Sequence, residues 1–327
     1  MLASLCLICA LAPAQSLLDH STKIASTQGW YAPHSALPVY SWINSTELIF
    51  LSAERSRGVQ GWNWVHWHRY NTKTKTSTLL EFLSRNADDA DNFEVSPDGK
   101  RVLWDGSRNH QPYWFEAKLD GSEFKVWPRH DVPGVISNDE PCSYAFWARD
   151  SRSVMESENF FSPKGDYQVW ERPIANPDIE KTFPRVEVSP FVMWAYPVTG
   201  GRMLGVSDNY LDGYKTDLCI WDPHHSGVVA SHHLCLPRPY TISWFSGVSP
   251  DGRHLLWELH SKLGSEDVAI ATTDLAGRNL RVIGALISKS VSSSFGGSAW
   301  VPGGKFVSFC YLGGLYVLPL PNAVGQN

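Results

Sequence analysis

The sequence lacks the features that define several large classes of protein. It has no excess of positive charge, because 28 Lys and Arg against 33 Asp and Glu give a net charge of −5. A dedicated nucleic-acid binder would be basic, so we expect no nucleic-acid partner. Only 19% of the residues are charged and 43% are hydrophobic, which excludes a disordered tail, a collagen or a coiled coil. No apolar run approaches the roughly 20 residues that cross a bilayer, so we expect no transmembrane segment.

Local signatures of catalysis and cofactor binding are also missing. No Gly-x-Ser-x-Gly elbow, Walker loop, His-Glu-x-x-His or dinucleotide fingerprint occurs. No window keeps a 3.6-residue apolar periodicity over three turns, and only Glu81–Ala90 is a candidate for a short helix, with a polar loop as the alternative. We therefore predict no cofactor and leave open whether the chain is an enzyme, with the missing motifs favouring a non-catalytic protein.

The first fourteen residues have the composition of an export signal. Met1–Ala14 is uncharged and mostly apolar, and Ala12-Pro13-Ala14 has the small-x-small form of a secretory cleavage site. No Lys or Arg precedes the apolar run, so a misassigned start or a buried apolar strand is the alternative. We predict a signal peptide at 1–14, a single domain at 15–327, and a periplasmic or extracellular location.

Export makes disulfides possible, and four cysteines follow the predicted signal. None of these cysteines has C-x-x-C spacing, which excludes a zinc ribbon or a thioredoxin motif. Cys219 and Cys235 flank a turn at 222–227, where they would face each other across one hairpin. The alternative is that Cys142, Cys219, Cys235 and Cys310 are buried small hydrophobic residues.

The chain contains an internal repeat. Val95–Trp104 and Val248–Trp257 are close copies built around Ser-Pro-Asp-Gly and a basic or polar pair, followed by apolar residues and Trp. Each copy predicts a strand, a tight turn and a returning strand, because Pro starts the turn, Asp caps it and Gly adopts a positive φ. Weaker copies lie at 148–155, 199–204, 301–307 and, most degenerate, 43–50.

The spacing of the copies predicts the fold. The Gly position of the turn is occupied in order by Ser45, Gly99, Ser151, Gly201, Gly252 and Gly304, at intervals of 50 to 54 residues. Such a period in an all-β chain is typical of propeller blades of four strands. The 23 residues after Gly304 are too few for a blade, and residues 15–45 supply the remainder of one period. We predict an all-β six-bladed propeller whose last blade is closed by the N-terminal strand.

The turn sequence resembles the WD40-like repeat of TolB-type β-propellers. Ser96–Lys100 and Ser249–Arg253 match it well, and the period extends the resemblance over residues 15–327. The resemblance implies the propeller fold, without the N-terminal α/β domain found in TolB proteins. The same repeat class occurs in propeller domains of serine peptidases and in oligogalacturonate lyases. Its Pro, Asp and Gly residues are structural, so it assigns no catalytic residue.

Candidate ligand-binding residues lie where the loops of one propeller face would meet. In five blades an acidic residue stands at the end of the second strand, where we expect it to point toward the axial funnel. With nearby basic and aromatic residues, the candidates are Glu54, Arg55, Trp62, Trp64, Asp105, Arg108, His110, Glu156, Glu158, Asp208, Tyr210, Glu258 and His260. Aromatic rings would stack on sugars and carboxylates would accept hydroxyl hydrogen bonds. The alternative is a solvated ring of carboxylates with Trp packed between blades.

The histidines suggest a metal site only weakly. His224-His225 and His232-His233 are adjacent pairs at a peripheral turn and strand, and neighbours along a strand point to opposite faces. His66 and His68 share a strand face and could share a metal with His110 and His260, but a Trp- and His-rich strand packed against a neighbouring blade is the better explanation. We predict no metal.

The expected function follows from the fold, the signal and the missing motifs. We expect an exported, monomeric, non-catalytic TolB-like binding module whose partner is a protein or an envelope or extracellular oligosaccharide. The alternative is a carbohydrate-active enzyme, either a polysaccharide lyase or a glycoside hydrolase, with its site in the propeller funnel. A glycoside hydrolase would need two carboxylates roughly 5–10 Å apart.

Overall fold

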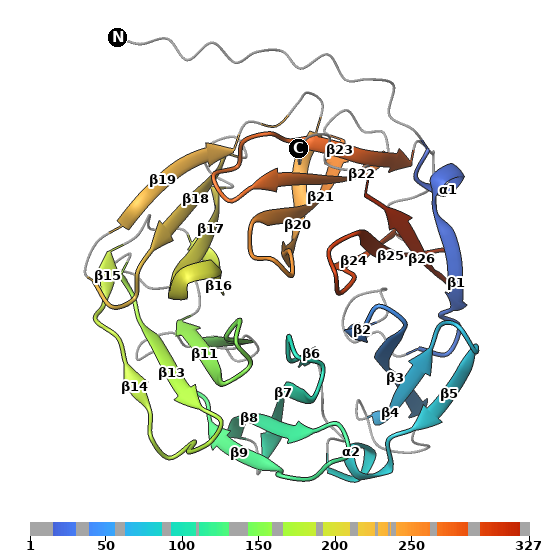
Figure 1. Ribbon diagram of the computed structural model, residues 1–327, viewed down its shortest axis with the longest axis horizontal. Helices are drawn as coiled ribbons and strands as arrows, with labels where there is room; N and C mark the ends of the chain where they lie inside the picture. Colours follow the sequence, from blue (N-terminus) through green and yellow to red (C-terminus); the bar gives the residue numbers. More distant parts are fainter. Residues whose placement is uncertain are drawn as a thin grey trace.

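Six antiparallel sheets of four strands surround a common axis in the computed structural model (Figure 1). The structure describes residues 16–30, 39–55, 63–86, 93–108, 111–130, 143–158, 166–187, 192–209, 215–225, 228–234, 236, 240–261, 267–286 and 295–320. The predicted all-β six-bladed propeller is therefore confirmed.

Each blade runs from its innermost strand to its outermost strand in chain order, except that the last blade takes its outermost strand from the N-terminal part of the chain. Blade 1 contains β2 (Tyr40–Asn44), β3 (Glu47–Arg55), β4 (Asn63–Asn71) and β5 (Thr76–Leu79), and blade 2 contains β6 (Phe93–Val95), β7 (Arg101–Arg108), β8 (Gln111–Lys118) and β9 (Lys125–Pro128). Blade 3 contains β10 (Ser143–Trp147), β11 (Ser153–Glu158), β13 (Val169–Pro173) and β14 (Lys181–Thr182), and blade 4 contains β16 (Val192–Pro197), β17 (Met203–Asn209), β18 (Lys215–Trp221) and β19 (Val228–Leu234). Blade 5 contains β20 (Tyr240–Val248), β21 (His254–Ser261), β22 (Val268–Asp274) and β23 (Arg281–Leu286), and blade 6 contains β24 (Phe295–Trp300), β25 (Phe306–Tyr311), β26 (Gly314–Pro319) and β1 (Thr22–Ser26).

The repeated turns join the first and second strands of the blades. In five blades the Gly position has a positive φ, with values of 71°, 60°, 70°, 71° and 67° at Gly99, Ser151, Gly201, Gly252 and Gly304. In the turn of blade 2 the Ser96 hydroxyl donates to Asp98 (2.7 Å) and accepts from the backbone N–H of Lys100 and of the next residue. These bonds fix the turn locally, which explains why the motif is read so clearly in the sequence.

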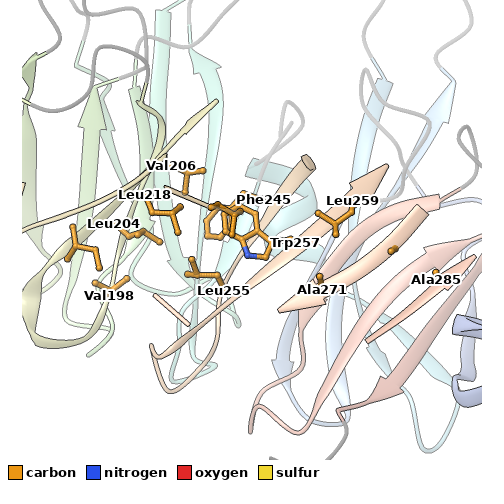
Figure 2. Packing of buried hydrophobic residues seen from close by; sticks show 13 residues of the cluster. Val198, Leu204, Val206, Leu218, Phe245, Leu255, Trp257, Leu259, Ala271 and Ala285 are labelled. Carbon is orange, nitrogen blue, oxygen red and sulfur yellow. The ribbon is translucent and has the colours of Figure 1, made fainter. Parts of the chain in front are cut away.

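The interface between two neighbouring blades is called a seam here and is numbered by its blades. Six apolar clusters fill the six seams. In seam 4–5, Phe245 and Trp257 of blade 5 pack against Val206 and Leu218 of blade 4 (Figure 2). The core is therefore a ring of sheet-on-sheet contacts.

The ring is closed at blade 6 by the N-terminal strand. β1 pairs antiparallel with β26, and Figure 1 shows them side by side. Helix α1 (Leu17–His20) precedes β1 and buries Leu17 in seam 5–6, and Trp30 stacks on Phe50 of blade 1 with ring centroids 4.2 Å apart. The prediction that the N-terminal strand closes the last blade is confirmed.

The remaining elements are short. They are helix α2 (Glu81–Asn86), the 3-10 turn η1 (Thr199–Gly201), and a two-stranded sheet of β12 (Asp166–Tyr167) with β15 (Val186–Glu187). Among the described residues, no helix is long and apolar enough to cross a membrane. The predicted signal at 1–14 lies outside the described residues, so it stays a prediction.

Candidate functional site

Two of the sequence candidates, Glu258 and His260, meet on one face of blade 5. Both lie on β21, two residues apart, so their side chains share a face. Across the innermost strand β20, Trp244 is the register partner of Glu258 and Thr241 that of His260. Cross-strand partners share a face of the sheet, and this face belongs to seam 5–6, because Leu256 of β21 packs there.

Glu258 ties blade 5 to blade 6. It is 4% exposed, and its Oε1 accepts a hydrogen bond from the backbone N–H of Ser298 on β24 at 2.7 Å. The hydroxyls of Ser298 and Ser246 lie 2.5 Å apart beside it. Burial raises the pKa of Glu258, although hydrogen bonds from Ser298 and Ser246 act in the opposite direction. The carboxylate is thus already engaged by the neighbouring blade.

Trp244 is 51% exposed although it lies on the innermost strand of its blade. The register of β20 shifts between Ile242 and Trp244 and again between Phe245 and Gly247. Such β-bulges re-aim side chains, so two of them in succession explain how a large aromatic leaves the packed face. The facing strand β24 begins Phe-Gly-Gly-Ser, and its two glycines present no side chain. The result is an aromatic surface near the axis.

His260 shares the blade face with this aromatic residue. Burial lowers its pKa below the ordinary value near 6.5, which favours the neutral form of the ring. Thr241 donates its hydroxyl to the His260 carbonyl at 3.4 Å, which holds the two strands in register here. A neutral imidazole has one donor and one acceptor, so it suits a ligand hydroxyl.

The other two described carboxylates among the candidates, Asp105 and Glu156, lie in seam 2–3. Asp105 on β7 is 3.8 Å from the guanidinium of Arg129, which lies over the Trp114 ring at 4.7 Å. Glu156 on β11 is 3% exposed. It accepts from the backbone N–H of His130 at 2.8 Å and contacts the Nδ1 of the same residue at 2.8 Å. Both carboxylates therefore bind consecutive residues that follow the outermost strand of blade 2.

His130 also reaches a second carboxylate. Its Nε2 lies 3.1 Å from Glu180, which pairs with Arg172, and its ring stacks on Trp170 at 4.1 Å. In a hydrolase triad the second ring nitrogen would face a nucleophile. Here it faces a carboxylate, so this arrangement is unsuited to nucleophilic catalysis.

The structure does not describe the other candidates fully. Glu54, Arg55, Trp64, Arg108, Glu158 and Asp208 lie on described strands, but their side chains are outside the described part. Trp62, His110 and Tyr210 lie outside the described residues altogether. Ligand binding by the candidate set as a whole stays a prediction.

Two residues of these seams escaped the sequence analysis. Trp244 gives no sequence signal, because a bulge that turns a side chain outward is invisible in the alternation of a strand. His130 follows the outermost strand of blade 2 directly after Arg129, where a loop is expected and no motif marks it. Its partner Glu180 is fifty residues further along the chain, so only the blade period relates the two.

The structure also places the remaining His and Cys candidates that it describes. His66 and His68 lie on β4 of blade 1, whereas His260 lies on blade 5. Within the described ranges no three His, Cys, Asp or Glu side chains form a group suited to a metal ion. The register of β18 and β19 places Ser231 opposite the buried Cys219, which differs from the predicted hairpin pairing. Cys142 and Cys235 lie outside the described residues. Cys310 is also buried, which raises the pKa of its thiol to about 12.

Comparisons with known proteins support the fold and nothing finer. No family model and no curated protein matches the sequence. The β-propeller domain of the Trilobed protease from Pyrococcus furiosus is similar at 14% identity and a TM-score of 0.50, covering 86% of this chain and 82% of that one. An acylaminoacyl peptidase in complex with Z-Gly-Gly-Phe-chloromethyl ketone is similar at 13% identity and a TM-score of 0.51, covering 86% and 44%. TolB from Acinetobacter baumannii has 15% identity and a TM-score of 0.47, covering 77% and 54%. The chain thus spans about half the length of the last two.

Proposed function

We propose that the protein is an exported, non-catalytic binding module that takes an oligosaccharide at the axial side of seam 5–6. The observation that carries the proposal is Trp244, which is 51% exposed on an innermost strand. Tryptophan is strongly buried on average, so a half-exposed indole near the axis has a cost that ligand binding would offset.

The surroundings of Trp244 favour a sugar over a protein partner. Protein hot spots lie in well-packed apolar surroundings that exclude water. Here the neighbours on β20 are the exposed Ser243 and the half-buried Ser246, and the imidazole of His260 shares the blade face. An exposed aromatic ring near hydroxyl and imidazole groups suits the apolar face of a sugar ring and its hydroxyls.

The contacts of Glu258 favour binding over catalysis. A glycoside hydrolase needs one carboxyl group as an acid and a second as base or nucleophile. The carboxylate of Glu258 accepts the Ser298 N–H at 2.7 Å, where it acts as a tie between blades. Export is proposed from the apolar leader Met1–Ala14, and N-terminal sequencing of protein recovered outside the cytoplasm should then begin at Gln15.

The proposal is tested by screening the purified protein on an oligosaccharide array and measuring the affinity of each hit by calorimetry. Trp244→Ala should weaken the best hit at least about tenfold, the usual scale for an aromatic stacking contact. Trp244→Phe should retain part of the affinity. Phe306→Ala is the matched control, because Phe306 is 41% exposed but lies on a second strand, at the repeated turn of blade 6.

Other outcomes would redirect the assignment. Shortened oligosaccharides in the product analysis would establish the carbohydrate-active enzyme instead. Binding that survives Trp244→Ala would place the sugar elsewhere on the propeller. No binding to any oligosaccharide would overturn the proposal and leave a protein partner as the better hypothesis.

A further inference from the structure

Two consecutive residues, Arg129 and His130, contact different blades at seam 2–3. Arg129 faces blade 2, where it contacts Asp105 and lies over the Trp114 ring. His130 faces blade 3, where its backbone N–H and Nδ1 both reach Glu156 and its ring stacks on Trp170. The chain therefore crosses from one blade to the other between these two residues, and the His130 contacts hold the crossing to blade 3.

The geometry around His130 favours a protonated ring. Nδ1 lies 2.8 Å from Glu156 and Nε2 lies 3.1 Å from Glu180, so each ring nitrogen faces a carboxylate oxygen. A neutral imidazole carries one N–H, whereas an imidazolium carries two and donates to both. If the ring loses a proton, one nitrogen turns a lone pair toward a carboxylate, which repels it.

The charges that face this group favour a charged ring. Glu156 comes from β11, and Glu180 immediately precedes β14. Arg172 of β13 is paired with Glu180, and Arg129 lies 3.8 Å from Asp105. Glu156 is 3% exposed and lies against the His130 ring. A positive charge on the ring offsets the cost of burying that carboxylate.

We propose that Glu156, His130 and Glu180 form a pH-sensitive clasp between blades 2 and 3, which is closed while the His130 ring is an imidazolium and opens when the ring loses its proton. Burial of His130 lowers its pKa, but the hydrogen bonds and charges of Glu156 and Glu180 outweigh burial and the net shift is upward. A raised pKa in the folded state gives stability that is fully present below the ordinary value near 6.5. That stability is lost as the pH rises through the pKa of the folded protein, so the clasp opens on the alkaline side.

The test is amide hydrogen exchange of the full chain, corrected for intrinsic rates, at about pH 6 and about pH 8.5. In the wild type, amides of β13 and β14 should exchange about tenfold faster at the higher pH, the scale of one lost charge-assisted hydrogen bond. Amides of β22 in blade 5 should not change. His130→Gln should exchange fast in β13 at both pH values, and the control His254→Gln, an exposed residue of β21, should behave as the wild type.

Glu180→Gln gives an independent arm if His130→Gln does not fold. Glu180→Gln removes one of the two negative charges that stabilise the protonated His130 ring, so the clasp should open at a lower pH. The pH at which the ring titrates, measured by NMR, should fall by the same amount. Exchange in β13 that is equal at both pH values in the wild type would overturn the proposal. So would a transition that persists in His130→Gln, or one that Glu180→Gln leaves in place.

Discussion

Seam 2–3 and seam 5–6 use the same kinds of residue for different ends. Each buries a carboxylate from the second strand of a blade, Glu156 and Glu258, and each carboxylate accepts a backbone N–H, at 2.8 and 2.7 Å. Each seam also holds a histidine. His130 lies between two carboxylates and its pKa is raised, whereas burial lowers the pKa of His260.

The difference shows that the neighbours of a residue, rather than its type or its place in the repeat, set its chemistry. In seam 2–3 Glu156 and His130 bind each other across the interface, so they hold the blades together. In seam 5–6 the carboxylate is satisfied but Trp244 is turned outward, which leaves an aromatic surface and a neutral imidazole. We therefore propose that seam 2–3 fastens two blades and that seam 5–6 offers the binding surface.

The largest effect on stability, and the one that most separates the two seams, is expected from deleting residues 15–37. The deletion removes β1 from blade 6 and Leu17 from seam 5–6, and leaves the described contacts of seam 2–3 in place. Loss of one buried Leu alone costs about 2–5 kcal/mol, so thermal unfolding should begin at least about 10 °C lower. Hydrogen exchange should rise first in blades 5 and 6. Unchanged melting would mean that the ring closes in some other way.

A smaller effect is expected at the repeated turns of blades 3 and 5. Gly252 has a φ of 71°, and a Cβ there would lie 2.4 Å from Cγ2 of Thr199, so Gly252→Ser should cost about 2–3 kcal/mol. Ser151 already occupies the same position in blade 3 with a φ of 60°, and its hydroxyl accepts the Asp98 N–H. Ser151→Gly removes the strain of a positive φ but also loses the hydrogen bond to Asp98. The free energy of unfolding, measured by urea denaturation, should therefore change by less than about 1 kcal/mol. Equal losses in both variants would contradict the account of these turns.

Amide substitution of the two buried carboxylates should separate the seams. Glu156→Gln places an amide N–H against the Nδ1–H of His130, so it should cost about 1–3 kcal/mol at about pH 6. Glu258→Gln keeps an acceptor for the Ser298 N–H and a donor for the nearby hydroxyls, so it should be nearly neutral. Because the pKa of Glu258 is raised, its contribution is present at low pH and lost as the pH rises through it. Urea denaturation across pH should show that loss in the wild type and not in Glu258→Gln.

The smallest effect is expected for the dependence of ligand affinity on pH. The pKa of His260 is lowered, which favours a neutral ring above the ordinary value near 6.5. If sugars bind beside Trp244, calorimetry between about pH 7 and about pH 8 should show less than about a twofold change in affinity. A steep gain in affinity on acidification would mean that a charged imidazole takes part in binding.

The fold was largely predictable because its signals are local. Ser96–Lys100 and Ser249–Arg253 form turns with their own side chains, and the period of the Gly positions counts the blades. The site was not predictable in this way, because the direction of a side chain depends on its offset from the turn. Asp105 and Glu258 stand six residues after the Gly position and face the following blade, whereas Glu156 stands five after it and faces the preceding blade. Adjacent offsets on a strand point to opposite faces, so Glu156 faces the opposite side of its blade from Asp105 and Glu258.

The most direct test of the contrast between the two seams is a thermal-shift titration of three proteins with the oligosaccharide that the array selects. The wild type and His130→Gln should both show a ligand-dependent rise in melting temperature, because a ligand that binds only the folded state stabilises it. Trp244→Ala should keep the melting temperature of the free wild-type protein to within a few degrees and lose the rise. A rise that persists in Trp244→Ala, or one that disappears in His130→Gln, would contradict the assignment of binding to seam 5–6 and fastening to seam 2–3.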